Sequence, residues 1–186
     1  HANHSGWSKH HPAEPLYSEA DARASLARLR GVGFDHGFEP VPGVHARFRA
    51  QGHILGAAAV TLEVEGRRIT FSGDLGRPDD PLMPAPASLA ASDWVVVEST
   101  YGNRAHPADG LEEELLAVLQ RVVARKGVVV IPAFAVGRAQ MLLHVITQLQ
   151  ASGRLAKVPV YLNSPMAASV TGLYRQFPRL HRLDAA

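Results

Sequence analysis

Three side chains that could bind a metal or move a proton stand at turns of this 186-residue chain. His53 lies between Gly52 and Gly56, and these glycines allow a tight turn after an extended segment. Asp74 and Glu98 each follow an apolar run. Imidazole and carboxylate groups are zinc ligands, and carboxylates also serve in acid–base catalysis. The pattern therefore predicts that buried strands place these groups in a cleft, where they could bind a metal ion that takes part in catalysis.

His53 and Asp74 each have an ordinary structural interpretation. A single histidine is more often structural than a metal ligand, and Ser-Gly-Asp after a strand is a common turn. The two residues nevertheless fall at the ends of segments that pair in a predicted hairpin. A His and an Asp at matching ends of neighbouring strands can bind one cation, which makes a shared metal site the sharper hypothesis.

Glu98 ends a fully apolar segment, so its carboxylate must be exposed in a cleft, paired or protonated. Two interpretations stay open. Glu98 belongs to a structural network with Arg104 or a neighbouring serine, or it orients a catalytic histidine. His106 follows a short loop later and is a candidate for that histidine.

Residues 132–140 join a predicted strand to a predicted helix and could bind a phosphate. Gly137 near the helix start leaves backbone N–H groups free, and Arg138 adds positive charge. The segment has neither the Gly-Lys-Ser/Thr of a Walker A loop nor the spacing of a dinucleotide fingerprint. Plain helix capping explains it equally well.

The segments before Glu98 predict an antiparallel β layer and one helix. Ser18 is a helix cap for residues 19–30. Residues 44–50 alternate apolar and polar side chains, and residues 57–64 and 68–71 flank a turn and predict a hairpin. Residues 94–97 are continuously apolar, which predicts a strand buried on both faces.

After Glu98 the hydrophobic period changes to that of helices. Helices are predicted over residues 111–125, 137–151 and 165–177, separated by strands at 128–131 and 158–162. Alternation of strands and helices with short connections predicts parallel strands. The chain as a whole is therefore predicted to be α/β. Ligands of such sheets gather at the carboxyl ends of the strands, where Glu98 and Ser164 fall.

The composition limits the classes of function. A hydrophobic fraction of 46% and a charged fraction of 19% are ordinary for a globular protein, and no apolar run is long enough for a membrane span. The absence of cysteine leaves histidine and carboxylates as zinc ligands and fits a cytoplasmic protein. A net charge of +2 permits nucleic-acid binding without predicting it. The histidines near the N-terminus are expected to be exposed loop residues.

Five segments, taken in order, resemble the β-CASP branch of the metallo-β-lactamase fold, which includes RNase J and the nuclease of the mRNA 3′-end cleavage complex. Residues 52–56 are similar to the family's motif with a zinc-binding His, and residues 72–74 to the motif with an Asp that bridges two zinc ions. Residues 98–102 resemble the acidic motif that opens the β-CASP domain. Two further stretches, 132–140 and 164–167, match segments inside that domain.

The resemblance implies that residues 1–97 are the C-terminal part of a metallo-β-lactamase-like domain and that residues 98–186 are the N-terminal part of a β-CASP domain with parallel strands. It implies two zinc ions that share a hydroxide, with His53 holding one zinc and Asp74 bridging both. Glu98 would orient a histidine that protonates the leaving oxygen, so Asp74 and Glu98 are the expected catalytic residues. Single-stranded RNA would lie in a cleft, with Arg138 and Ser164 as phosphate contacts.

The chain departs from the family pattern in one motif, and this motif would distinguish three possible classes of function. The family's His-x-His-x-Asp-His motif, which supplies most zinc ligands, is not found upstream of His53. The chain is therefore expected to be an internal segment of a longer ribonuclease, inactive when isolated. The alternatives are a catalytically silent scaffold subunit of an RNA-processing complex and a small-molecule metallo-hydrolase. A homodimer or a place in a processing complex is expected, with no membrane partner.

Overall fold

The computed structural model describes residue 6, residues 9–10, 12–105 and 110–183. The chain divides into two compact units, His1–Gly33 and Phe34–Ala186. The predicted division near Val97 lies inside the second unit and stays a prediction. Within the described residues, no helix is long and apolar enough to cross a membrane.

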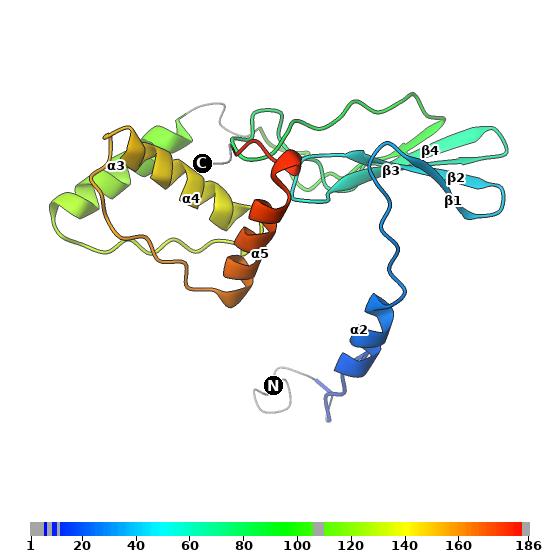
Figure 1. Ribbon diagram of the computed structural model, residues 1–186, viewed down its shortest axis with the longest axis horizontal. Helices are drawn as coiled ribbons and strands as arrows, with labels where there is room; N and C mark the ends of the chain where they lie inside the picture. Colours follow the sequence, from blue (N-terminus) through cyan, green and yellow to red (C-terminus); the bar gives the residue numbers. More distant parts are fainter. Residues whose placement is uncertain (1–5, 7–8, 11, 106–109, 184–186) are drawn as a thin grey trace. The chain divides into compact units, whose positions relative to one another are not determined.

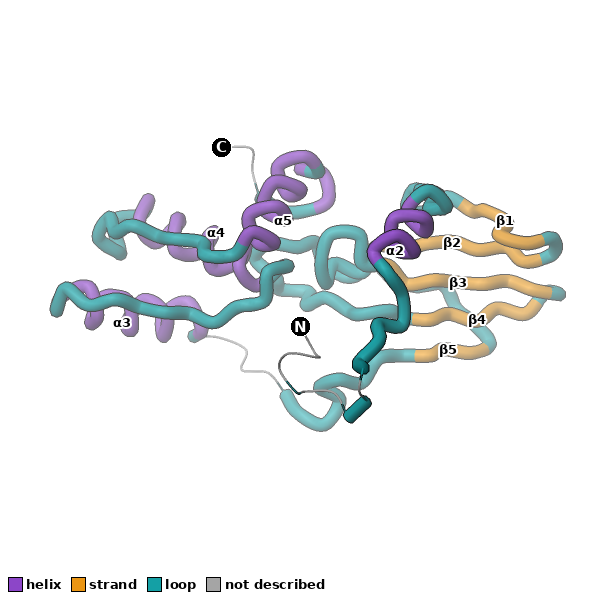
Figure 2. The backbone as a smooth tube through the Cα atoms, turned by 90° about the horizontal axis from the view of Figure 1, so that it is seen from below, coloured by secondary structure: helices purple, strands orange, loops and turns teal. Residues whose placement is uncertain are grey.

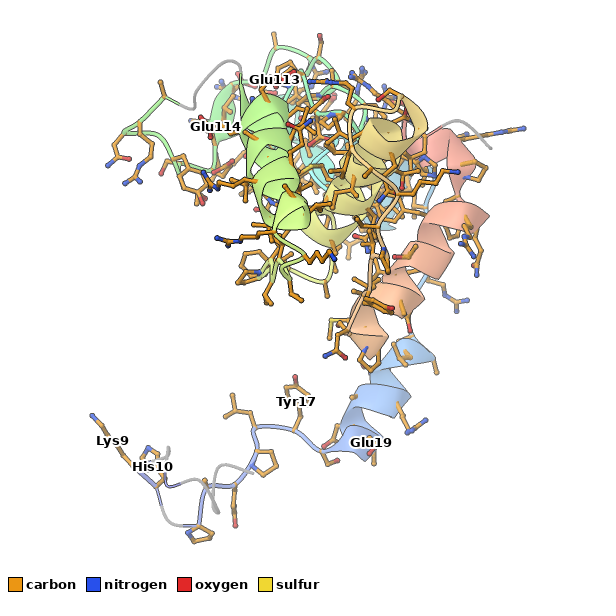
Figure 3. All side chains as sticks on the ribbon, turned by 90° about the vertical axis from the view of Figure 1, so that its left-hand side faces the viewer. Lys9, His10, Tyr17, Glu19, Glu113 and Glu114 are labelled. Carbon is orange, nitrogen blue, oxygen red and sulfur yellow. The ribbon has the colours of Figure 1, made fainter. Side chains whose placement is uncertain are left out.

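The first unit contains helix α2 (Glu19–Leu26), which begins as predicted and ends four residues earlier than expected. The Ser18 hydroxyl accepts the Asp21 N–H, and the Asp21 carboxylate accepts the Ser18 N–H, so the two residues form a capping box. Glu19, labelled in Figure 3, pairs with Arg23 one turn later. No residue of α2 is buried, so capping and side-chain pairs support this helix rather than packing.

The second unit contains a five-stranded sheet in the order β1-β2-β3-β4-β5, seen side by side in Figure 2. The strands are β1 (Gly37–Val41), β2 (Val44–Ala50), β3 (Ala58–Val64), β4 (Arg67–Phe71) and β5 (Trp94–Val96). The predicted hairpin is confirmed as β3–β4, joined by Glu65 and Gly66. Both turn residues have positive φ, 50° and 73°, as a two-residue turn between twisted strands requires.

The pairing of β5 corrects the expectation of a wholly antiparallel layer. β4 pairs antiparallel with β3 but parallel with β5, so the sheet is mixed. The expectation that residues 94–97 are buried on both faces is also wrong. Trp94, Val95 and Val97 are 54%, 60% and 60% exposed. β5 is the last strand in the sheet order, so it has a paired neighbour on one side only.

Opposite faces of the sheet differ in polarity because neighbouring residues of a strand point to opposite sides. One cross-strand row consists of apolar residues from all five strands: Phe38, Ala46, Leu62, Ile69 and Trp94. On the other face, the Thr70 hydroxyl lies 3.0 Å from that of Thr61 and 2.7 Å from that of Ser92. These hydroxyls link β3 to β4, and β4 to Ser92 just before β5. Thr70, in the middle of this row, is buried.

Three helices follow the sheet, as the hydrophobic period predicts: α3 (Leu111–Ala124), α4 (Arg138–Ala151) and α5 (Pro165–Gln176) (Figure 1). A short 3-10 helix, η1 (Pro178–Leu180), comes last. The core between α3 and α4 is formed by apolar side chains from both helices and the segment after α4: Leu116, Leu119, Ile146, Leu149 and Leu155. Arg154 adds ion pairs to Glu112 at 2.9 Å and to Glu113 at 2.6 Å. Glu113 lies on the first turn of α3 (Figure 3).

The predicted parallel strands at 128–131 and 158–162 are wrong: the structure has no strand in either segment. Val128, Val130 and Tyr161 are 86%, 83% and 86% exposed. A strand needs a neighbouring backbone for its hydrogen bonds, and apolar composition alone does not supply one. Among the described residues, the parallel pair is β4–β5.

A second core joins α5 to the loop after Asp80. Leu82, Met83 and Tyr174 are buried together, and the Tyr174 hydroxyl lies 3.7 Å from the Met83 sulfur. The Arg182 backbone N–H donates to the Leu82 carbonyl at 2.8 Å, and its guanidinium donates to the Asp80 carbonyl at 3.0 Å. This loop therefore connects the helical part of the unit to the turns that carry the candidate site.

Candidate metal and phosphodiester site

The sheet topology brings the three candidate site residues, His53, Asp74 and Glu98, to the same end of the sheet. β2, β4 and β5 run in the same direction, because β3 is antiparallel to β2 and β4 while β5 is parallel to β4. His53 follows the end of β2, Asp74 the end of β4 and Glu98 the end of β5. The expectation of matching strand ends is therefore confirmed at the level of the backbone.

The turns that carry His53 and Asp74 are in direct backbone contact. The Gly76 N–H donates to the Gln51 carbonyl at 2.8 Å. A Cβ placed on Gly76 would lie 2.3 Å from the Gly52 carbonyl carbon and 2.3 Å from its oxygen. Such distances exclude any side chain at position 76. The contact fixes the Asp74 turn against the His53 turn.

Two further glycines are required by the same arrangement. Gly52 has φ of +61°, and a Cβ there would lie 1.9 Å from the Pro84 carbonyl oxygen. Gly73 has φ of +57°, and its Cβ would lie 2.5 Å from the Ala58 carbonyl oxygen. Both positions combine a left-handed backbone with a close approach, so only glycine fits. The glycines noted in the sequence thus hold turns together as well as permitting them.

His53 and Asp74 have solvent-exposed side chains, as metal-ligand candidates at an open site need. Within the described residues, no group of three or more His, Cys, Asp or Glu side chains is placed to hold a metal ion. The chain therefore brings the two turns together without assembling a three-ligand zinc site in its described part.

The Glu98 carboxylate is held by backbone N–H groups. It accepts the Thr100 N–H at 2.9 Å. This bond, followed by the Thr100 hydroxyl, holds the pKa of the Glu98 carboxyl below its ordinary value. Burial raises that pKa, while the Leu75 N–H and the charge of His53 lower it further. Glu98 is therefore ionised at neutral pH and lies near both the Asp74 turn and His53.

The two alternative interpretations of the Glu98 carboxylate stay open. The Glu98 backbone N–H donates to the Ser72 hydroxyl at 3.0 Å, so a Glu–Ser link exists through the backbone. Arg104 donates to the Asn103 side chain at 3.3 Å. His106 lies outside the described residues, so its predicted relation to Glu98 stays a prediction.

The helix α4 starts beside the His53 turn, because a Cβ on Gly137 would lie 3.3 Å from the Ile54 side chain. Arg138, the first residue of α4, is exposed. Its backbone N–H already donates to the Val136 carbonyl at 3.0 Å, and the Ala139 N–H donates to Phe134 at 3.2 Å. A phosphate at this helix start would therefore be bound by the Arg138 guanidinium more than by these amides.

Ser164 is the N-cap of α5, where its hydroxyl accepts the Ala167 N–H at 3.2 Å. This capping role neither requires nor prevents a contact with RNA. Gln140, which the sequence analysis did not select, joins the starts of α4 and α5. Its buried amide nitrogen lies 3.1 Å from the Ala135 carbonyl, 3.3 Å from the Ala167 carbonyl and 3.1 Å from the Thr171 hydroxyl. A glutamine between Ala139 and Met141 on a predicted helix was the available clue.

The similar proteins include a ribonuclease, a cleavage and polyadenylation specificity factor and an RNase J-like protein. Residues 139–186 match the Beta-Casp domain. A ribonuclease of Thermus thermophilus is 36% identical over 170 residues, which are 91% of this chain and 38% of that protein. Cleavage and polyadenylation specificity factor 73 of Drosophila melanogaster is 33% identical over 165 residues, 87% of this chain and 24% of the factor.

An RNase J-like protein of Methanocaldococcus jannaschii is 30% identical over 168 residues, which are 87% of this chain and 39% of that protein. The chain thus spans less than half the length of each of these three relatives. Because it extends over 87% to 91% of the chain, the similarity covers the His53 and Asp74 turns. The resemblance to the β-CASP branch drawn from the motifs is confirmed by the domain match over residues 139–186 and by these relatives.

Proposed function

We propose that the full-length protein hydrolyses phosphodiester bonds of RNA with the help of two bound zinc ions. The observation that carries the proposal is the backbone contact between the His53 and Asp74 turns, with Glu98 beside them. Support also comes from the relatives, which are named as ribonucleases, an RNase J-like protein and a cleavage factor.

The side chains of His53 and Asp74 fit part of a zinc site. Imidazole nitrogen and carboxylate oxygen are the zinc donors open to a chain without cysteine. Three or four protein ligands are usual for zinc, so further ligands must come from outside the described residues. When bound, zinc lowers the pKa of a water molecule and stabilises negative charge on phosphoryl oxygens. The role of this chain is to hold two ligand-bearing turns in fixed register.

Glu98 is proposed to orient a histidine that serves as the general acid. A carboxylate whose pKa is lowered stays charged at neutral pH, so Glu98 is a poor proton donor itself. It is well suited to accept a hydrogen bond from an imidazole N–H, which fixes the tautomer and the direction of that ring. Asp74 and Glu98 are thus assigned different roles, a metal ligand and a positioning carboxylate.

Single-stranded RNA is the proposed substrate, because a cleft between the domains of the full-length protein, as the resemblance implies, would admit one strand. Arg138 is proposed to contact a phosphate through its exposed guanidinium, and Ser164 to contribute from the start of α5. We place this activity in the cytoplasm and in a homodimer or an RNA-processing complex. Residues 1–97 would belong to a metallo-β-lactamase-like domain and residues 98–186 to the β-CASP domain.

Cleavage of a labelled single-stranded RNA by the full-length protein, with zinc measured by elemental analysis, tests the proposal. Asp74→Asn is expected to abolish cleavage and lower the zinc content, because it removes the charge that holds the metals. Asp79→Asn is the matched control, since Asp79 is an exposed aspartate of the same loop that pairs with Arg77. RNA binding without cleavage would identify a silent scaffold. Hydrolysis of small esters but not RNA would identify a small-molecule hydrolase.

A further inference from the structure

The Ser72 hydroxyl lies at the junction of the Asp74 turn and the Glu98 segment. Ser72 is 3% exposed. Its hydroxyl donates to the Gly73 carbonyl at 2.7 Å and lies 3.0 Å from the Glu98 backbone nitrogen, whose N–H donates to it. One hydroxyl can donate once and accept at the same time, so both bonds form together.

The backbone of Ser72 extends the pairing of β4 with β5. Its N–H donates to the Val96 carbonyl at 2.9 Å, one residue beyond the last paired residue of β4. This backbone bond sets the distance between the two segments. The Ser72 hydroxyl accepts the N–H of Glu98, two residues after Val96. Because Gly73 precedes Asp74 directly, the same hydroxyl restrains the backbone next to both acidic residues.

We propose that Ser72 is a positioning residue that sets the Asp74 carboxylate and the Glu98 carboxylate in register for the reaction; this inference rests on the proposed function. Ser72 itself contacts neither metal nor RNA. A shift of about 1 Å in a reacting group lowers rate by about a hundredfold, whereas it affects binding of an extended substrate much less. Loss of the hydroxyl should therefore lower kcat more than it raises KM.

Ser92 provides a matched control at the opposite end of β5. Its hydroxyl lies 2.7 Å from that of the buried Thr70, so it also links β4 to the β5 segment. Ser92 lies just before the start of β5, whereas Asp74 follows the end of β4 and Glu98 the end of β5. Ser92 is therefore at the opposite end of the β4–β5 pair from both acidic residues. Ser92→Ala removes a cross-strand hydroxyl without touching the proposed site.

The test compares Ser72→Ala, Ser72→Thr and Ser92→Ala in the full-length protein. Ser72→Ala is expected to lower kcat for RNA cleavage about tenfold to a hundredfold, with KM and zinc content close to wild type. Ser72→Thr keeps the hydroxyl and is expected to restore most of kcat. Ser92→Ala should leave kcat near wild type. Hydrogen exchange of the Glu98 amide should be faster in Ser72→Ala and unchanged in Ser92→Ala.

Three results would overturn the inference. One is a kcat for Ser72→Ala equal to that of Ser92→Ala, and another is unchanged exchange of the Glu98 amide. The third is a loss of activity that Ser72→Thr fails to restore while Ser72→Cys, which is nearly the same size as serine, retains activity. An inactive wild-type protein would instead refute the proposed function, and amide exchange would still decide whether Ser72 holds Glu98.

Discussion

Gly76 lies against Gly52, and the contact leaves no space for a side chain at position 76. A Cβ on Gly76 would lie 2.3 Å from two atoms of the Gly52 carbonyl group, and the Gly76 N–H donates to the neighbouring Gln51 carbonyl. The relative position of the candidate ligands His53 and Asp74 therefore depends on a contact between two backbones.

Gly76→Ala is expected to lower the free energy of unfolding by about 1–3 kcal/mol, because the new methyl group forces the two turns apart. Urea unfolding followed by circular dichroism would measure the change. Gly172→Ala is the control: nothing lies within 4 Å of its Cβ, and it stands inside α5. There alanine should raise stability by about 0.5–1 kcal/mol. Equal effects at the two positions would contradict the contact.

Glu98→Gln in the full-length protein is expected to keep zinc bound and to slow RNA cleavage by about 10²–10⁴-fold, the range for a disturbed general acid. The amide keeps the size of the carboxylate but removes its charge, so a histidine oriented by Glu98 would face a weaker, uncharged acceptor. Single-turnover cleavage rates beside zinc analysis measure both quantities. Loss of zinc in this variant would show that Glu98 is a metal ligand instead.

The pH dependence of stability should contain a contribution from Glu98. The Thr100 N–H lowers its pKa in the folded chain, so the folded state binds this proton less readily than the unfolded state. The contribution is therefore present above the unfolded pKa of about 4.3 and is lost as the pH falls through the lowered folded pKa.

Acidification from about pH 5 downward should thus destabilise wild type more than Glu98→Gln. Urea midpoints across this range would show the difference. Glu114→Gln, which removes an exposed charge on α3, is the matched control. A wild-type profile that runs parallel to that of Glu98→Gln would contradict the prediction.

The 186-residue chain alone is expected to bind zinc weakly and to leave RNA uncleaved. His53 and Asp74 are two ligands, and a catalytic zinc usually has three protein ligands and a water molecule. Elemental analysis after dialysis against zinc, with a cleavage assay on labelled single-stranded RNA, decides the matter. Stoichiometric zinc together with cleavage would refute the expectation.

Local patterns were sufficient to predict the elements that depend on neighbours in sequence. The helices predicted over residues 111–125, 137–151 and 165–177 each agree with the observed helix to within one residue, because their hydrogen bonds form within a single segment. The hairpin β3–β4 was predicted for the same reason, with its short Glu65–Gly66 turn.

Elements that depend on distant partners were predicted less well. Residues 128–131 are as apolar as β5, yet they form no strand because no neighbouring backbone pairs with them. β1 was missed because Gly37 and Pro40 disfavour strands, and Pro40 is tolerated there because β1 is the first strand of the sheet order. In the candidate site, the residue types His53, Asp74 and Glu98 were identifiable from the sequence. The Gly52–Gly76 contact and the Ser72–Glu98 bond were not, because each joins segments more than twenty residues apart.

β5 has consequences for handling the protein in solution. Trp94, Val95 and Val96 are each more than half exposed on a strand that is paired on one side only. An edge strand of apolar residues without lysine or proline offers its free N–H and C=O groups to any extended chain it meets. Aggregation in concentrated samples of the 186-residue chain should therefore begin at β5, and a lysine in place of Val95 should delay it.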